Sequence, residues 1–209
     1  TDDHPYAIAY SKPYKKIINN KGEVLLDSLV NATEIRDELY DLILKTNAVL
    51  PFYKFSKNNS GLFGYYYPER NQIIVPDKYN RVNFYFDKED EYRMYYYGYN
   101  SEQKRLDIYN ISDETLLKSI QCSNYKFDNQ ISSYDDRPEG LYIMIIDGDQ
   151  KSVIDFKGNE ILPNHTYFNI SISSETITAD DKIFDLKGNF IRKTSSEDTD
   201  DEDRKSTRL

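Results

Sequence analysis

Carboxylates are the most abundant groups in this chain that could do chemistry. The segment SSYDDRPEG places Asp135, Asp136 and Glu139 within a few residues of one another, and hydrolysis of a glycosidic bond requires a pair of carboxylates. Because the chain holds 36 acidic residues, such neighbours also arise by chance. These three residues support an alternative, a carbohydrate-active protein, but the pattern is not specific enough to assign a catalytic residue.

The chain contains few of the histidine and cysteine residues that commonly bind metal ions or take part in nucleophilic catalysis. The chain has two histidines, His4 and His165, and one cysteine, Cys122, whereas a catalytic triad or a His-based metal site needs several such groups. The segment DGD at residues 147–149 lacks the further spaced carboxylates of a calcium loop. Asp-Gly between two apolar runs instead indicates a hairpin turn. We expect no metal, no cofactor and no enzymatic activity.

The charge balance narrows the range of partners. The formal net charge is −9, and no basic stripe offers the contacts that a phosphate backbone needs, so we expect no nucleic-acid partner. No apolar run approaches the roughly twenty residues of a membrane span, so we expect a soluble chain without membrane insertion. A single cysteine allows no internal disulfide and slightly favours the inside of a cell. Because the first residue is Thr1 and not Met, export fits as well.

Aromatic residues must supply much of the core. The chain has twenty Tyr, ten Phe and no Trp, and buried rings carry large apolar area. The alternation of RVNFYF at residues 81–86 is typical of a half-buried strand. It predicts that four rings of the segment 61–86 point inward: Phe63, Tyr65, Phe84 and Phe86. Tyr66 and Tyr85, one step out of phase, are then expected to be accessible.

A second aromatic stretch, YRMYYYGYN at residues 92–100, has rings on both faces of any strand. An exposed tyrosine cluster suits recognition of a protein or a sugar, since each ring buries a large area and keeps a hydroxyl for hydrogen bonding. The candidate binding surface consists of Tyr66, Tyr85, Tyr95, Tyr96 and Tyr97. A strand buried on both faces would explain the same rings equally well.

A nine-residue pattern recurs along the chain. VIDFKGNEI at residues 153–161 returns as IFDLKGNFI at 183–191, and looser copies begin at Ile17, Tyr66 and Ile108. Its third position is usually Asn or Asp, whose side chain can accept the backbone N–H two residues on. Its sixth position holds residue types that tolerate positive φ: Gly22, Asn71, Asp113, Gly158 and Gly188. Each copy therefore predicts a strand, a tight turn and a strand.

These hairpins predict a mostly β fold, an irregular array of antiparallel β-hairpin repeats that is solenoid or propeller-like. One segment differs, because its apolar residues have helical spacing: Ile35, Leu39, Leu42 and Ile43. We predict one α-helix near residues 33–46. We expect a single repeat domain over residues 1–194 and a charged, flexible tail over residues 195–209.

The segment GLFGYYYPERNQIIVPDKYNRV resembles a WG repeat, a bacterial β-repeat family whose units carry a Gly-x-Trp-Gly-Tyr signature, a short turn and a later Ile-Pro. The matching residues are Gly61, Phe63, Gly64, Tyr65, Val75, Pro76, Tyr79 and Val82. A second unit is similar at Ile154, Asp155, Lys157, Gly158 and Pro163. The likeness covers about residues 10–193, but the signature Trp is absent and Phe63 stands in its place. The resemblance implies a structural and binding repeat, with no catalytic residues to carry over.

We therefore expect a non-enzymatic binding module that mediates protein–protein interaction. Its acidic charge favours a basic protein partner, and a toxin-neutralising immunity protein is one specific version. The alternative is a carbohydrate-binding or glycoside-hydrolysing propeller-like protein, in which tyrosine rings serve as sugar platforms.

Overall fold

The computed structural model describes residues 6–35, 52–87, 93–111, 115–127 and 142–194. Within these ranges the chain is built of β-strands and one 3₁₀ turn, and none of the described residues lies in an α-helix. None of its described helices is long and apolar enough to cross a membrane. The chain divides into two compact units, Thr1–Ile120 and Gln121–Leu209. The single repeat domain expected over residues 1–194 stays a prediction. The tail at 195–209 lies outside the described residues.

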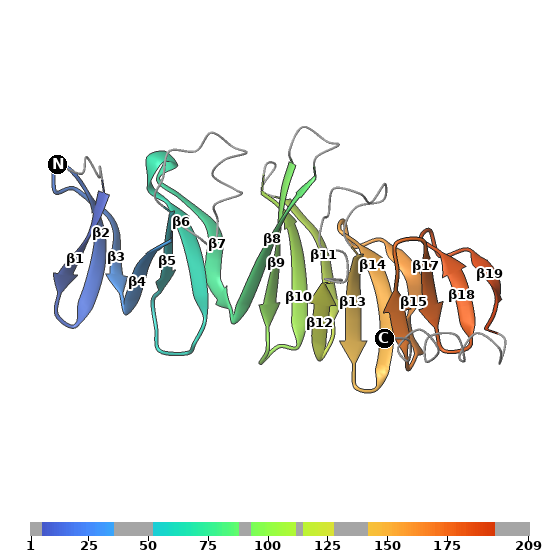
Figure 1. Ribbon diagram of the computed structural model, residues 1–209. Helices are drawn as coiled ribbons and strands as arrows, with labels where there is room; N and C mark the ends of the chain where they lie inside the picture. The colour runs from blue at the N-terminus through green and yellow to red at the C-terminus, as the bar shows by residue number, and fades with distance from the viewer. Residues whose placement is uncertain (1–5, 36–51, 88–92, 112–114, 128–141, 195–209) are drawn as a thin grey trace, which may run out of the picture. The chain divides into compact units, whose positions relative to one another are not determined.

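Unit 1 contains three antiparallel sheets (Figure 1). Sheet A has three strands: β1 (Tyr6–Ser11), β2 (Tyr14–Asn19) and β3 (Val24–Leu29). Sheet B has four, with the 3₁₀ turn η1 (Pro68–Arg70) before the last: β4 (Asn31–Ile35), β5 (Phe52–Ser56), β6 (Phe63–Tyr67) and β7 (Gln72–Tyr79). Sheet C also has four: β8 (Arg81–Asp87), β9 (Arg93–Asn100), β10 (Arg105–Asn110) and β11 (Thr115–Gln121). The strands of each sheet follow one another in sequence order, so each sheet is a simple meander.

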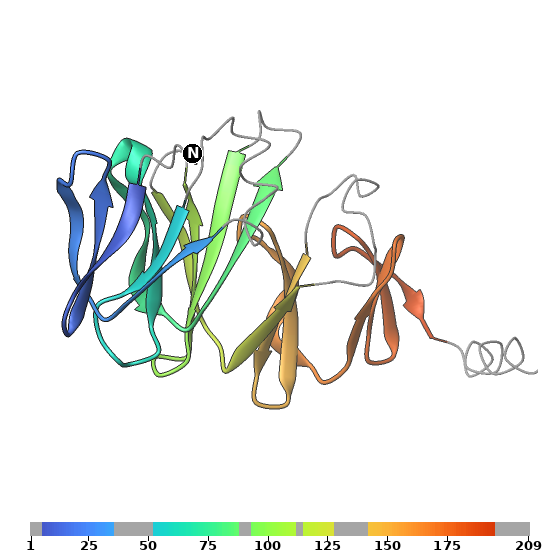
Figure 2. The same cartoon turned by 60° about the vertical axis from the view of Figure 1, so that its left-hand side comes forward.

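Unit 2 contains two further four-stranded meanders (Figure 2). Sheet D consists of β12 (Asn124–Phe127), β13 (Tyr142–Asp147), β14 (Gln150–Asp155) and β15 (Glu160–Tyr167). Sheet E consists of β16 (Ile170–Ile172), β17 (Thr176–Ala179), β18 (Lys182–Asp185) and β19 (Phe190–Lys193). The predicted mostly β array of antiparallel hairpins is therefore confirmed.

Each sheet carries one copy of the nine-residue pattern, at the connection between its last two strands. The turn within each of the two clearest copies of the pattern is held by hydrogen bonds between neighbouring residues. In sheet D, Oδ1 of Asp155 accepts the backbone N–H groups of Lys157 and Asn159, each at 2.8 Å. In sheet E, Asp185 accepts the equivalent bonds from Lys187 and Asn189. Hydrogen bonds from the Asn189 side chain and backbone hold the pKa of Asp185 below its ordinary value.

Four of the five sixth-position residues have the left-handed conformation that the pattern predicts: Gly22 (φ 81°), Asn71 (φ 50°), Gly158 (φ 87°) and Gly188 (φ 84°). Asn71 ends η1, and its N–H donates to the carbonyl of Pro68. The fifth residue, Asp113, lies outside the described residues. After each of these turns the chain enters the last strand of its sheet. In sheets A to D a link of one or two residues then leads to the first strand of the next sheet.

Successive sheets within a unit pack face to face. Sheets A and B bury one core, in which Ile17 and Leu29 meet Tyr53, Phe55 and Tyr66. Sheets B and C bury a second core, formed by Tyr65, Tyr67, Val75, Tyr79 and Tyr96. Sheet B is therefore buried on both faces.

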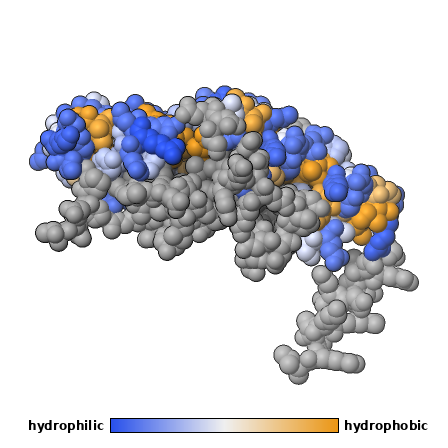
Figure 3. All heavy atoms as spheres, turned by 90° about the horizontal axis from the view of Figure 1, so that it is seen from above, coloured by the Kyte–Doolittle hydropathy of each residue, from blue (hydrophilic) through white to orange (hydrophobic). Residues whose placement is uncertain are grey.

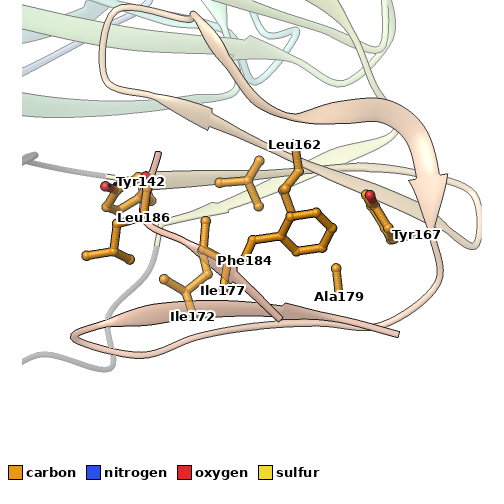
Figure 4. Close-up of a cluster of buried hydrophobic side chains, with 9 residues drawn as sticks. Tyr142, Leu162, Tyr167, Ile172, Ile177, Ala179, Phe184 and Leu186 are labelled. Carbon is orange, nitrogen blue, oxygen red and sulfur yellow. Dashed lines mark hydrogen bonds between the residues drawn. The ribbon is translucent and has the colours of Figure 1, made fainter. Parts of the chain in front are cut away.

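Unit 2 has its own core between sheets D and E. Leu162 and Phe184 point toward one another there (Figure 4). The hydroxyl of Tyr142 in β13 donates to the carbonyl of Leu186 at 2.9 Å. The turn that follows β18 is thus attached to sheet D as well as to its own sheet.

The prediction of an α-helix near residues 33–46 is wrong for its first residues. Residues 31–35 form β4, in which Thr33 pairs with Lys54 and Ile35 with Phe52 of β5. A long-range strand partner thus overrides the local helical spacing, as tertiary context often does. The rest of the predicted helix, residues 36–46, lies outside the described residues.

Candidate functional site

The tyrosines predicted to form an exposed binding surface are mainly core residues. Four of them are buried, with these exposed fractions: Tyr66 1%, Tyr95 2%, Tyr96 3% and Tyr97 0%. The fifth, Tyr85, is half-buried and packs against the ring of Tyr95. The predicted accessibility of Tyr66 is wrong because β6 lies in a middle layer. Tyr66 faces the core with sheet A, while Tyr65 and Tyr67 face the core with sheet C.

The predicted inward rings lie on the core between sheets B and C. Tyr65 is buried there, and Phe63 and Phe84 pack against it in edge-to-face contacts. The side chain of Phe86 lies outside the described residues. The alternation therefore identified one core face, but it did not show that the opposite face of β6 is also a core.

The groups considered for catalysis do not assemble in the described part of the chain. Asp135, Asp136 and Glu139 lie outside it, as do His4 and the side chain of His165. Residues 147–149 form the predicted turn between β13 and β14, with Gly148 at φ 60°. Among the described residues, no three His, Cys, Asp or Glu side chains come together as a metal site would require.

A polar cluster around one buried carboxylate joins sheets B and C instead. We call it the Asp107 cluster: Lys78, Tyr79, Arg105, Asp107 and Ser119. Asp107 is 1% exposed, and its Oδ2 accepts the Tyr79 hydroxyl at 2.9 Å. The Arg105 guanidinium lies 3.1 Å from Oδ1 and donates to Oδ2 at 3.2 Å. The Ser119 hydroxyl donates to Oδ1, and the Lys78 ammonium lies 3.7 Å from Oδ2.

Aromatic rings surround this cluster. Tyr96 meets Tyr79 edge to face, and its ring stacks on Tyr109 with centroids 4.8 Å apart. The Lys78 ammonium lies over the rings of Tyr79 and Tyr109, at 5.1 and 5.5 Å. Burial, reinforced by Tyr96 and Asp107, raises the pKa of Tyr79 far above the ordinary value of a phenol. Burial also raises the pKa of Tyr96.

The geometry makes the Asp107 cluster an anchor and not a reactive centre. Both carboxylate oxygens of Asp107 already accept hydrogen bonds, and the raised pKa keeps the Tyr79 hydroxyl protonated. A general base or nucleophile needs a free lone pair directed at a substrate. What the cluster does is tie the last strand of sheet B to two strands of sheet C.

Sequence reasoning missed these residues. Asp107 lies between Leu106 and Ile108, which are both buried, and an acidic residue inside an apolar strand is a signal of a paired charge. Arg105, two residues earlier, shares its face. The partner Tyr79 comes from another sheet, and nothing in the local pattern identifies it.

Accessible apolar residues occur at a different place, near the start of the last strands. Each of these strands is an edge of its sheet. We call these residues the last-strand edge, with exposed fractions as follows: Val24 50%, Ile73 42% and Leu116 49% in unit 1, and Phe190 57% and Ile191 50% in unit 2. In unit 1 the turns that precede β3 and β7 lie at the same, upper end of their sheets (Figure 1). Seen from that end, hydrophobic groups reach the surface in several places among hydrophilic ones (Figure 3).

No protein-family model and no curated protein sequence matches this chain. Among solved structures, one similar chain is dihydro-heme d1 dehydrogenase NirN in complex with DHE, at 11% identity and a TM-score of 0.33. The alignment covers 94% of this chain and 46% of that chain, so this chain spans less than half of the NirN length. A TM-score of this size supports no inference about function.

Proposed function

We propose that this chain is a non-enzymatic repeat module that binds a protein partner through the last-strand edge of unit 1. One observation carries the proposal: equivalent positions of several sheets each present a large apolar side chain that is at least two-fifths exposed, such as Val24, Ile73 and Phe190. Single exposed apolar residues are common on protein surfaces. Their recurrence at one position of a repeated sheet is what favours an interaction surface.

The edge position supports a protein ligand over a sugar. Within the described residues, each last strand has one side without a neighbouring strand in its sheet. Edge strands with apolar side chains are suited to contacts with another polypeptide. The tyrosine platforms expected for a sugar are instead mainly buried. The net charge of −9 favours a basic partner, and an immunity-type protein that masks a basic enzyme is one such arrangement.

The repeated construction supports a second part of the proposal. The nine-residue pattern occupies the same connection in all five sheets, so we infer that the sheets derive from one repeated unit similar to the WG repeat. Within one unit, such repeats present equivalent surfaces on successive sheets, and repeat proteins bind extended partners through surfaces of this kind.

The test compares edge variants with a matched control in affinity capture from extracts of the source cells. Ile73→Lys and Leu116→Lys place a charge in the proposed surface. Asn59→Lys makes the same charge change at an exposed position of the β5–β6 loop, which lies at the opposite end of sheet B in Figure 1. We expect a discrete protein retained by the parent and by Asn59→Lys to be lost from both edge variants. Equal capture by all four chains would overturn the proposal.

A further inference from the structure

Unit 1 has another exposed surface, at the end of its sheets opposite the turns of the nine-residue pattern. Each sheet is a meander, so the connection that precedes the pattern lies at that other end. These connections are residues 12–13 in sheet A, 57–62 in sheet B and 101–104 in sheet C. Figures 1 and 2 both show them at one end of unit 1, the lower end in Figure 1. We call them the lower loops, and all their residues are described.

Each lower loop contains one exposed lysine: Lys12, Lys57 and Lys104. Glu102 is the one carboxylate in these three loops. The lower loops are therefore basic on balance, although the net charge of the whole chain is −9. Because salt screens charges that are far apart, a compact anionic group close to the loops experiences mainly their positive charge.

Carboxylates of the neighbouring strands are engaged within the fold. Asp77 accepts the backbone N–H of Lys57 at 3.3 Å. Asp27 forms an ion pair with Lys16 at 3.2 Å, and Asp107 is buried. The lysines of the lower loops therefore present their charge at a surface where the nearby acidic groups already have other contacts.

Two exposed tyrosines flank the first lower loop. Tyr10 is 77% exposed and Tyr14 is 46% exposed, and no other tyrosine in the described part of the chain is as accessible. The Lys15 ammonium lies 5.6 Å from the centroid of the Tyr10 ring. Tyrosine is enriched among the residues that dominate binding energy at protein interfaces. The surface thus combines cations with accessible rings.

Hydrogen bonds order the two longer loops. The amide of Ser60 donates to Oδ1 of Asn58 at 3.0 Å, and the amide of Gln103 donates to Oδ1 of Asn100 at 2.9 Å. A surface that is ordered before binding loses less conformational entropy when a ligand arrives.

The corresponding connections of unit 2 contain no lysine. They are residues 148–149 between β13 and β14, which read Gly-Asp, and residues 180–181 between β17 and β18, which read Asp-Asp. The repeat therefore does not need a lysine at this place to fold. The three lysines are a feature of the surface of unit 1 and not of the β-repeat as such.

The stacking of the sheets sets the spacing of these lysines. Sheets that pack face to face lie about 10 Å apart, so one lysine on each sheet gives cations roughly 10 Å apart. A polyproline II helix has three residues per turn and rises about 3.1 Å per residue. Its every third side chain therefore lies on one face, about 9 Å from the next. Carboxylates at every third residue of such a segment match the lysine row.

We propose that the lower loops of unit 1 bind an acidic segment of a second partner protein, in the polyproline II conformation, with Asp or Glu at every third residue. Prolines between the carboxylates would pack on Tyr10 and Tyr14, as proline-rich segments pack in aromatic-lined grooves. Duplex nucleic acid fits less well, because it carries a charge about every 1.7 Å of its axis. The lower loops are separate from the last-strand edge, so either proposal can fail without the other.

The test measures binding of a labelled, end-blocked peptide, Pro-Glu-Pro-Pro-Glu-Pro-Pro-Glu-Pro, to the full chain by fluorescence anisotropy at low ionic strength. A peptide with Gln in place of each Glu keeps the backbone and removes the charge. Three surface ion pairs, each contributing about twofold to fivefold, predict that the Gln peptide binds about tenfold more weakly. The peptide Pro-Pro-Pro-Glu-Glu-Glu-Pro-Pro-Pro turns its carboxylates to three different faces and should also bind more weakly than the first.

Two triple variants separate the lower loops from net charge. Both replace exposed lysines by glutamine, so both change the charge of the chain equally. The first variant carries Lys12→Gln, Lys57→Gln and Lys104→Gln, and the control carries Lys21→Gln, Lys157→Gln and Lys187→Gln. We expect the first variant to bind the Glu peptide about tenfold more weakly and the Gln peptide unchanged. The control should bind both peptides as the parent does.

Four results would overturn the proposal. One is no binding of the Glu peptide at millimolar concentration. Another is an equal loss in both triple variants, which would show that only net charge matters. Tighter binding of a single-stranded oligonucleotide that the first variant abolishes would assign the lower loops to nucleic acid. Much stronger peptide binding after the carboxylates of residues 197–203 are replaced by amides would assign them to the chain's own acidic tail.

Discussion

The hydroxyl of Tyr79 in β7 donates a hydrogen bond to the buried carboxylate of Asp107 in β10, at 2.9 Å. This bond crosses from sheet B to sheet C inside a core of packed rings. Because the residues belong to different repeats, the bond contributes to the stacking of one repeat on the next.

Tyr79→Phe should lower the free energy of unfolding by about 1–3 kcal/mol, since it leaves a buried acceptor of Asp107 with one donor fewer. Asp107→Asn should also destabilise the chain, because it removes the charge that pairs with Arg105. Urea denaturation of both single variants and the double variant gives the coupling energy. Strictly additive effects would mean that the two side chains do not interact.

The chain should lose stability in alkaline solution as its buried tyrosines become able to ionise on unfolding. Burial raises the pKa of Tyr79 and Tyr96, and burial with the bond to Glu69 raises the pKa of Tyr67 to about 12. An unfolded chain releases these protons near pH 10. The contribution is therefore complete below about pH 10 and is lost as the pH rises toward the folded pKa values.

Phenolate absorbance and circular dichroism, followed together, check this expectation. The phenolate signal of the buried rings should appear only with unfolding, and Tyr79→Phe should make stability fall less steeply above about pH 10. Complete tyrosine ionisation in a chain that stays folded would contradict it.

Gly98→Ala should be destabilising although Gly98 has an ordinary strand conformation. A Cβ at this position would lie 2.5 Å from Cε2 of the Tyr79 ring, and forcing an atom into a packed core costs about 1–3 kcal/mol. Thermal or urea denaturation measures the loss. In a Tyr79→Leu background the same substitution should cost much less, and an unchanged cost would show that the ring is not the obstacle.

Gly188→Ala and Gly22→Ala form a matched pair. Their φ angles are 84° and 81°, but a Cβ on Gly188 would lie 2.1 Å from the Ile161 carbonyl oxygen, whereas a Cβ on Gly22 meets nothing within 4 Å. Gly22→Ala should cost roughly 1–2 kcal/mol for the left-handed backbone. Gly188→Ala should cost at least about 1 kcal/mol more, because the contact adds overpacking. Equal losses in denaturation would contradict the close approach of sheets D and E.

The turns could be predicted from sequence because their physics is local. Asp155 and Asp185 accept hydrogen bonds from the amides two and four residues further on. The glycine in each turn adopts its left-handed conformation without a partner that is distant in sequence. Sheet layering is different. Whether Tyr66 is exposed depends on sheet A covering β6, and whether residues 33–35 form a helix or a strand depends on β5.

The candidate sites show the same division. The alternation of apolar and polar residues predicted that Tyr65 and Phe84 share a core. The hydrogen bond between Tyr79 and Asp107 joins two sheets, and no local sequence pattern predicts it. The last-strand edge can be identified only when the strand order of each sheet is known, because that order shows which strand is an edge. The nine-residue pattern marked those strands without revealing their position in the sheet.

Site-specific photo-crosslinking in the source cells tests the central claim, binding of a protein through the last-strand edge, most directly. A photoreactive phenylalanine analogue is placed at Ile73 in one chain and at Asn59 in another, because both positions are exposed. The account predicts a discrete crosslinked protein from position 73 that is absent from position 59. The same crosslinks from both positions, or none from position 73 while the chain is folded and present, would contradict it.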